Sequence, residues 1–73
     1  MAKRIGIIGG GQLGLMIAEE AHRQGALVYA LDPAPDAPAF AECDGHIVAA
    51  YDNLGALEQL GDMTDVLTYE FEN

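Results

Sequence analysis

The chain has 73 residues, of which 12 are acidic and 3 are basic, so its formal net charge is −9. This balance argues against binding to nucleic acid or to an anionic membrane surface, because phosphate groups there are recognised largely by Lys and Arg. Cys43 is the only cysteine and no apolar run approaches the roughly 20 residues of a membrane span, so we expect a cytoplasmic protein of at most one small domain.

The first half of the chain predicts a β-α-β unit. Residues 4–8 form a short apolar run with three isoleucines, typical of a strand buried on both faces. Residues 12–24 predict a helix that ends at Gly25, where a C-terminal cap glycine belongs. Residues 27–32 predict a second strand, parallel to the first. Helical spacing predicts a sheet-facing stripe of Leu13, Met16, Ile17 and Ala21.

The second half completes a four-stranded sheet. Three prolines in residues 33–40 exclude regular structure there, and a short helical turn is expected over residues 39–43. Residues 46–49 and 65–69 predict two further strands. Between them Asp52 or Asn53 caps a helix that runs to Leu60 and buries Leu54, Leu57 and Leu60 on one face. The fold class is therefore α/β, a Rossmann-like parallel sheet with strand order 3-2-1-4.

The stretch GGGQLG, residues 9–14, follows the first predicted strand and opens the first helix. Gly9 permits a tight turn, Gly11 lets the backbone approach a ligand, and Gly14 lets the helix pack near the strand. The N–H groups and dipole of the first helical turn then favour an anion. The alternative is that these glycines only make a tight turn.

Two acidic residues lie at predicted strand ends, where ligands bind in open parallel sheets. Asp32 ends the second strand, roughly 20 residues after the glycines, where an acid accepts hydrogen bonds from the ribose of NAD. It also precedes Pro33, which favours a role as a turn former. Glu70 follows the fourth strand, across the crevice from the glycines, and there it binds hydroxyls or an amine of a ligand or is a solvated loop acid.

Other polar residues predict structural roles. His22 and His46 have no metal-ligand spacing to each other or to Cys43, so we expect no metal site, and Cys43 is expected to be a small packing residue. No catalytic residue is predicted. Glu19 and Arg23 are expected to pair on the exposed face of the first helix.

Three segments together resemble a known family: IGIIGGGQLGLMIAEEAHRQG, LDPAPDAPAF and DVLTYEFEN. They are similar to the N-terminal domain of 5-(carboxyamino)imidazole ribonucleotide synthases, ATP-grasp ligases of purine biosynthesis. The resemblance covers residues 1–73, which would be the incomplete pre-ATP-grasp domain of a three-domain enzyme. The absence of a helix after the last strand predicts the same truncation.

The resemblance implies an activity and a set of site residues. The parent enzyme would use ATP and bicarbonate to carboxylate 5-aminoimidazole ribonucleotide through carboxyphosphate, as a homodimer. Gly11, Gln12 and Leu13 would line the ribonucleotide site at the helix start and Glu70 would bind the ribonucleotide from the fourth strand. Asp32, Tyr69 and Glu72 are lesser candidates. ATP and magnesium would bind between domains absent here, which would also supply the missing cations, so the chain alone would be inactive.

Three alternatives differ from this interpretation. One is the NAD-binding half of a dehydrogenase, and another is a related ATP-grasp enzyme, ATP-dependent phosphoribosylglycinamide formyltransferase. The third is a nucleotide-sensing or purely structural Rossmann-like module. The TYEFEN segment favours the synthase family over all three.

Overall fold

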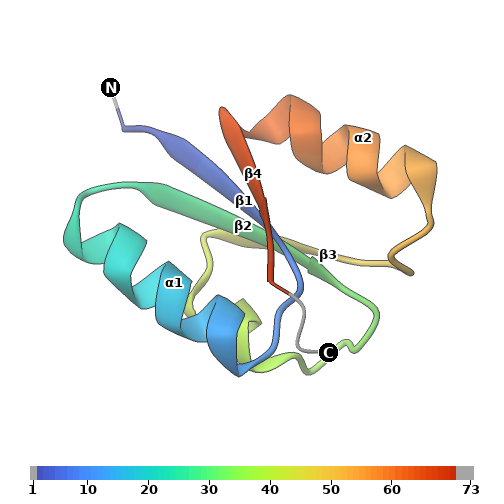
Figure 1. Ribbon diagram of the computed structural model, residues 1–73, viewed down its shortest axis with the longest axis horizontal. Helices are drawn as coiled ribbons and strands as arrows, with labels where there is room; N and C mark the ends of the chain where they lie inside the picture. The colour runs from blue at the N-terminus through green and yellow to red at the C-terminus, as the bar shows by residue number, and fades with distance from the viewer. Residues whose placement is uncertain (1, 71–73) are drawn as a thin grey trace.

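The computed structural model describes residues 2–70, and Glu72 lies outside the described residues. The four strands form one parallel sheet in the order β3-β2-β1-β4, which confirms the predicted topology (Figure 1). Each element lies within a few residues of its expected position. The elements in chain order are β1 (Arg4–Ile8), α1 (Gln12–Arg23), β2 (Leu27–Asp32), the 3-10 helix η1 (Pro38–Glu42), β3 (Gly45–Val48), α2 (Leu54–Met63) and β4 (Val66–Tyr69).

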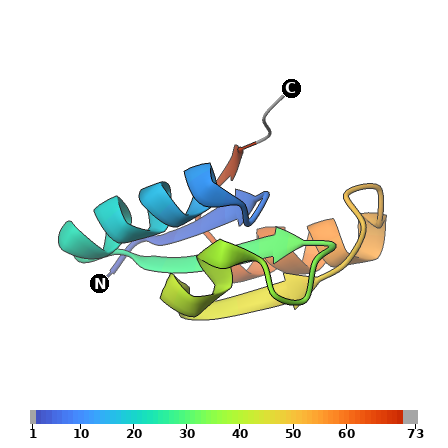
Figure 2. The same cartoon turned by 90° about the horizontal axis from the view of Figure 1, so that it is seen from below.

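The two helices cover opposite faces of the sheet (Figure 2). Successive residues of a strand point to opposite faces, so neighbouring residues of β1 enter different clusters. Ile7 packs with Ala18 and Ala21 of α1, whereas Ile8 packs with Ala56 and Leu60 of α2. The central strands β1 and β2 are thereby buried on both sides, as their apolar runs predict.

The predicted sheet-facing stripe of α1 is partly wrong. Ile17 and Ala21 pack against the core as expected, but Leu13 is 37% exposed and Met16 is 56% exposed. Besides Ala21, the buried positions are Gly14 and Ala18, which the predicted stripe did not include. The cause is size, because small residues let the helix axis approach the sheet closely and leave the longer side chains on its flanks.

The polar partners on α1 also differ from the expectation. Arg23 pairs with Glu20 at 2.7 Å, one turn away, rather than with Glu19. Glu20 also accepts a hydrogen bond from the Gln24 side chain at 3.0 Å. Two donors therefore converge on Glu20, and together they lower the pKa of its carboxyl, the Gln24 hydrogen bond contributing most.

The ends of both helices follow the local sequence signals. Gly25 has a φ of 83°, and its N–H donates to the carbonyl of His22. The N–H of Ala26 donates to the carbonyl of Ala21, which completes the pattern of a glycine-terminated helix. Asn53 begins α2, because its side chain accepts a hydrogen bond from the Ala56 N–H at 3.0 Å.

The prediction of the buried face of α2 is correct toward the end of the helix and wrong at its start. Leu60 is fully buried and Leu57 is partly buried, but Leu54 is 77% exposed. Leu54 is the first residue of the helix, and within residues 2–70 it is not among those packed against the core on this face. Ala56 takes its place in the core.

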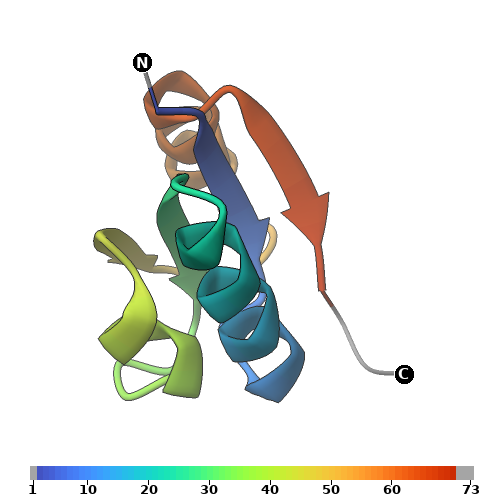
Figure 3. The same ribbon diagram turned by 90° about the vertical axis from the view of Figure 1, so that its left-hand side faces the viewer.

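The carboxyl ends of β1, β2 and β4 lie at the same edge of the sheet as the start of α1 (Figure 3). Parallel pairing places them there, with Ile8 opposite both Leu31 and Tyr69. The sequence candidates within the described residues therefore lie along one edge. Neither helix within residues 2–70 is long and apolar enough to span a bilayer.

Candidate functional site

Three glycines of the turn are required by the packing of the protein itself. Gly9 has a φ of 118°, and a Cβ there would lie 2.5 Å from the carbonyl oxygen of Glu70. A Cβ on Gly10 would lie 2.9 Å from that of Ala37, and one on Gly14 would lie 2.5 Å from the carbonyl oxygen of Gly9. The spacing of these glycines therefore reflects close contacts within the fold.

Gly11 differs from its neighbours, because a Cβ at this position would meet no atom of residues 2–70 within 4 Å, its chain neighbours aside. Its φ of −76° is accessible to any residue, so the fold does not require glycine here. Gly11 begins α1 and makes no side-chain cap. The open space lies at the exposed start of a helix, next to Gln12 and Leu13, which are also exposed.

The first helical turn offers hydrogen-bond donors to this space. The first N–H groups of an α-helix have no acceptor within the helix. Within residues 2–70, no side chain caps the start of α1, and the helix dipole adds partial positive charge there. The Gln12 side chain adds an amide to the same surface. The arrangement suits an anionic or polar ligand.

Glu70 lies beside the turn, as the strand order predicts. Its N–H donates to the carbonyl of Ile8 at 2.9 Å, and its own carbonyl lies against Gly9. Its carboxylate accepts a hydrogen bond from the Thr68 hydroxyl at 3.0 Å. Thr68 pairs with Ile7, whose side chain faces α1, so the carboxylate is on the α1 side of the sheet. Tyr69 is 65% exposed and points to the opposite side.

Asp32 is engaged by the protein. One oxygen, Oδ2, accepts from the Gly10 N–H and from the Tyr51 hydroxyl, both at 2.8 Å. The other, Oδ1, accepts from the Ala34 N–H at 2.9 Å. The last bond closes an Asx turn before the proline loop, which supports the turn-former interpretation. The Tyr51 contact was missed, and no motif or periodicity indicates it.

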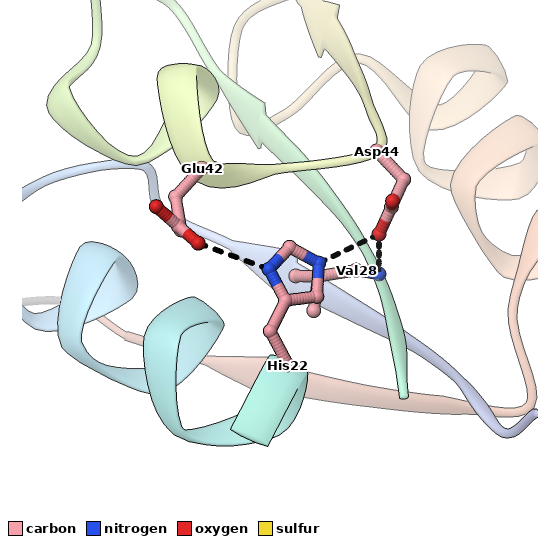
Figure 4. Close-up of polar contacts among 4 residues, drawn as sticks. All are labelled: His22, Val28, Glu42 and Asp44. Carbon is pink, nitrogen blue, oxygen red and sulfur yellow. Dashed lines mark hydrogen bonds and ion pairs between the residues drawn. The ribbon is translucent and has the colours of Figure 1, made fainter. Parts of the chain in front are cut away.

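His22 connects three segments outside this edge of the sheet (Figure 4). Its Nδ1 lies 3.1 Å from Oε2 of Glu42, and its Nε2 lies 2.8 Å from Oδ2 of Asp44. Asp44 also accepts from the Val28 N–H at 2.7 Å. Carboxylates only accept, so two such contacts favour the doubly protonated imidazolium. The hydrogen bonds with Asp44 and then Glu42 raise the pKa of His22.

The other two predicted structural residues occupy packed environments. The Cys43 side chain packs against the core on the α1 face, and burial raises the pKa of its thiol to about 11. The thiol therefore stays protonated and unreactive at neutral pH. His46 stacks on Phe40 with ring centroids 4.2 Å apart.

The model of the ribonucleotide synthetase preATP-grasp domain matches residues 1–73. The chain belongs to this domain family. A Rossmann-like sheet with the order β3-β2-β1-β4 is therefore the fold of a preATP-grasp domain. The dehydrogenase alternative is not supported by this membership.

Relatives of this preATP-grasp domain are synthases. The chain is 55% identical over 69 residues to the N5-carboxyaminoimidazole ribonucleotide synthase of Staphylococcus haemolyticus, covering 94% of the chain and 18% of that protein. The solved structure of the Staphylococcus aureus synthetase complexed with ADP has a TM-score of 0.94 at 49% identity, covering 100% of the chain and 20% of that one. The chain thus spans less than a fifth of the length of the curated relatives it matches.

A third relative was solved with two bound ligands. The synthase of Aspergillus clavatus, in complex with ADP and 5-aminoimidazole ribonucleotide, has a TM-score of 0.85 at 38% identity. The match covers 96% of this chain and 19% of that one.

The cations of this preATP-grasp domain lie away from the glycine turn. Lys3 and Arg4 precede or begin β1, and Arg4 contacts Asp65 at 3.4 Å. Arg23 ends α1. Within residues 2–70, no group of three His, Cys, Asp or Glu side chains is arranged to hold a metal.

Proposed function

We propose that the chain is the N-terminal, substrate-binding segment of an ATP-dependent carbon–nitrogen ligase of purine biosynthesis. The full-length enzyme carboxylates the exocyclic amine of 5-aminoimidazole ribonucleotide with bicarbonate and converts ATP to ADP and phosphate. The observation that carries the proposal is the family match over residues 1–73. The ligands of the Aspergillus clavatus relative support the choice of substrate.

The edge of the sheet supplies complementary groups for one side of a ribonucleotide. Gly11, Gln12 and Leu13 present N–H groups at the positive end of the α1 dipole, suited to anionic or carbonyl oxygens. Glu70 presents a carboxylate, which accepts from hydroxyl or amine groups of the same ligand. We assign ribonucleotide binding to these four residues. Glu72 remains a lesser candidate, and Tyr69 is the weakest because it points to the α2 side of the sheet.

The remaining components of the reaction belong to other parts of the full-length protein in this proposal. ATP, magnesium and the cations that complete the phosphate site would be held there, because Arg4 and Arg23 are paired elsewhere. The full-length enzyme would be a cytoplasmic homodimer. The 73-residue chain alone would hydrolyse no ATP, and ATP turnover by the purified chain would contradict this assignment.

Isothermal titration of the full-length protein tests the proposal. We expect binding of 5-aminoimidazole ribonucleotide, weaker or no binding of phosphoribosylglycinamide, and no binding of NADH. Binding of NADH without binding of aminoimidazole ribonucleotide would overturn the proposal in favour of a dehydrogenase. Preference for phosphoribosylglycinamide would instead indicate the related formyltransferase.

A further inference from the structure

Asp32, the last residue of β2, is hydrogen-bonded to three other segments at the carboxyl edge of the sheet. Its carboxylate accepts from Gly10 in the glycine turn, from Ala34 in the proline loop and from Tyr51 after β3. Its backbone carbonyl accepts from the Ala49 N–H at 3.2 Å. A carboxylate has about four acceptor positions, so three donors leave little capacity for a ligand. Asp32 is therefore built into the protein rather than aimed at the open space.

The bond to Gly10 acts on the surface that faces the ligand. Gly10 lies between Gly9, whose backbone packs against Glu70, and Gly11, which borders the open space at the start of α1. The Asp32 carboxylate holds the Gly10 N–H at 2.8 Å. The orientation of this peptide sets the direction in which the chain enters α1, and hence the direction of the N–H groups of Gln12 and Leu13.

Tyr51 holds the acceptor in place. Its hydroxyl donates to the same oxygen of Asp32 that receives the Gly10 N–H. Burial and then the neighbouring Asp32 raise the pKa of Tyr51 to about 12, so the phenol remains a donor at neutral pH. Burial alone would raise the pKa of Asp32, but the hydrogen bonds from Ala34, Gly10 and Tyr51 outweigh it and lower the pKa, so the carboxylate remains an acceptor.

We propose that Asp32 and Tyr51 are positioning residues that hold the glycine turn in the conformation in which its N–H groups meet the ribonucleotide. This inference rests on the proposed function. It differs from the role that the end of β2 has in dinucleotide-binding folds, where the acid contacts the ribose directly. Here Asp32 acts on the ligand-facing surface by holding the Gly10 N–H. Tyr51, in the loop after β3, acts by holding the Asp32 carboxylate.

The test is Tyr51→Phe in the full-length enzyme, because this variant removes the hydroxyl and keeps the ring. Losing one hydrogen bond that orders the turn should raise the KM for aminoimidazole ribonucleotide about two- to tenfold. The KM for ATP and kcat should stay unchanged. The matched control is Tyr29→Phe, since Tyr29 lies on β2 among core residues of the α2 face. Its hydroxyl donates no hydrogen bond to a side chain within residues 2–70. The control should leave all three parameters unchanged.

A second variant, Asp32→Asn, should raise the same KM further, because the amide weakens acceptance from both Gly10 and Tyr51. An equal ribonucleotide KM in wild type, Tyr51→Phe and Tyr29→Phe would overturn the inference. So would a fall in kcat with no change in that KM, which indicates a purely structural role, or an equal rise in the KM for both substrates. If the wild type fails to bind the ribonucleotide by titration, the proposed function itself fails, and that result is separate from any effect of the variants.

Discussion

Replacing Gly11 by Ala separates ligand binding from folding in the glycine turn. In the part of the chain that the structure describes, a Cβ here meets no atom within 4 Å beyond its chain neighbours, and the φ of −76° suits alanine. The cost to the fold is limited to the poorer helix-start preference of Ala compared with Gly, below about 1 kcal/mol. The free energy of unfolding should therefore change little.

The same methyl group would enter the space that we assign to the ribonucleotide. If it displaces the ligand from the N–H groups of Gln12 or Leu13, at least one hydrogen bond to a charged group is lost. Such a bond contributes about 1.5–3 kcal/mol, which corresponds to a roughly tenfold or greater rise in Kd. We expect this rise for aminoimidazole ribonucleotide and an unchanged Kd for ATP, both measured by isothermal titration of the full-length protein.

The matched control is Gly55→Ala, another glycine in an exposed helical turn. Among residues 2–70, a Cβ on Gly55 would approach the Asn53 side-chain oxygen at 3.6 Å and no other atom within 4 Å, and α2 lies on the other face of the sheet from α1 (Figure 2). This variant should keep the wild-type Kd. A wild-type Kd for the ribonucleotide in Gly11→Ala, with the thermal midpoint unchanged, would refute the assignment of the open space at Gly11 to the ligand.

Three other predictions address the neighbours of the turn and the histidine. Gly9→Ala should cost about 2 kcal/mol or more, because it combines a strained φ of 118° with a Cβ placed 2.5 Å from the Glu70 carbonyl oxygen; an unchanged midpoint in denaturant unfolding would contradict this. Glu70→Gln should raise the KM for the ribonucleotide about tenfold through loss of a charged acceptor, with the KM for ATP unchanged, and equal shifts in both would argue against a binding role. The pKa of His22 is raised in the folded state by Asp44 and Glu42, so its contribution is complete below its unfolded pKa of about 6.5 and is lost as pH rises through the folded pKa. Thermal midpoints between about pH 6 and pH 9 should show this loss, amounting to less than about 1 kcal/mol, and His22→Gln should abolish it; the same pH dependence in that variant would exclude His22 as its source.

The order and type of the elements follow from local signals. The apolar runs of residues 4–8 and 27–31 predict buried strands, and both are central in the sheet. Gly25 adopts a left-handed backbone conformation at the end of α1, and the Asn53 side chain caps the start of α2. Both roles are those that their chemistry predicts. These strands and helix ends are determined by residues within a few positions of one another, so periodicity and turn chemistry are enough to predict them.

Contacts between distant segments could not be read in this way. Helical spacing assigns Leu13 and Met16 to the core and leaves out Gly14 and Ala18, because it ranks hydrophobicity and not the distance at which the helix packs. Similarly, Tyr51 and Asp32 are separated by 19 residues and meet only through the parallel pairing of β2 with β3. His22 of α1 meets carboxylates about 20 residues away, on Glu42 at the end of η1 and on Asp44 just after it.

The glycine turn shows why its spacing alone cannot name a ligand. Gly9, Gly10 and Gly14 are explained by close approaches to Glu70, to Ala37 and to each other, so this fold needs them whatever the ligand is. Of the glycines of the turn, Gly11 makes no such close approach to any of residues 2–70. Asp32, at the position of the acid that binds NAD in related folds, is here hydrogen-bonded to the turn. The residues that distinguish one ligand from another are therefore those around the glycines. Exchanging Gln12 or Glu70 should change which ligand binds, whereas exchanging Gly9 or Gly14 should change whether the protein folds.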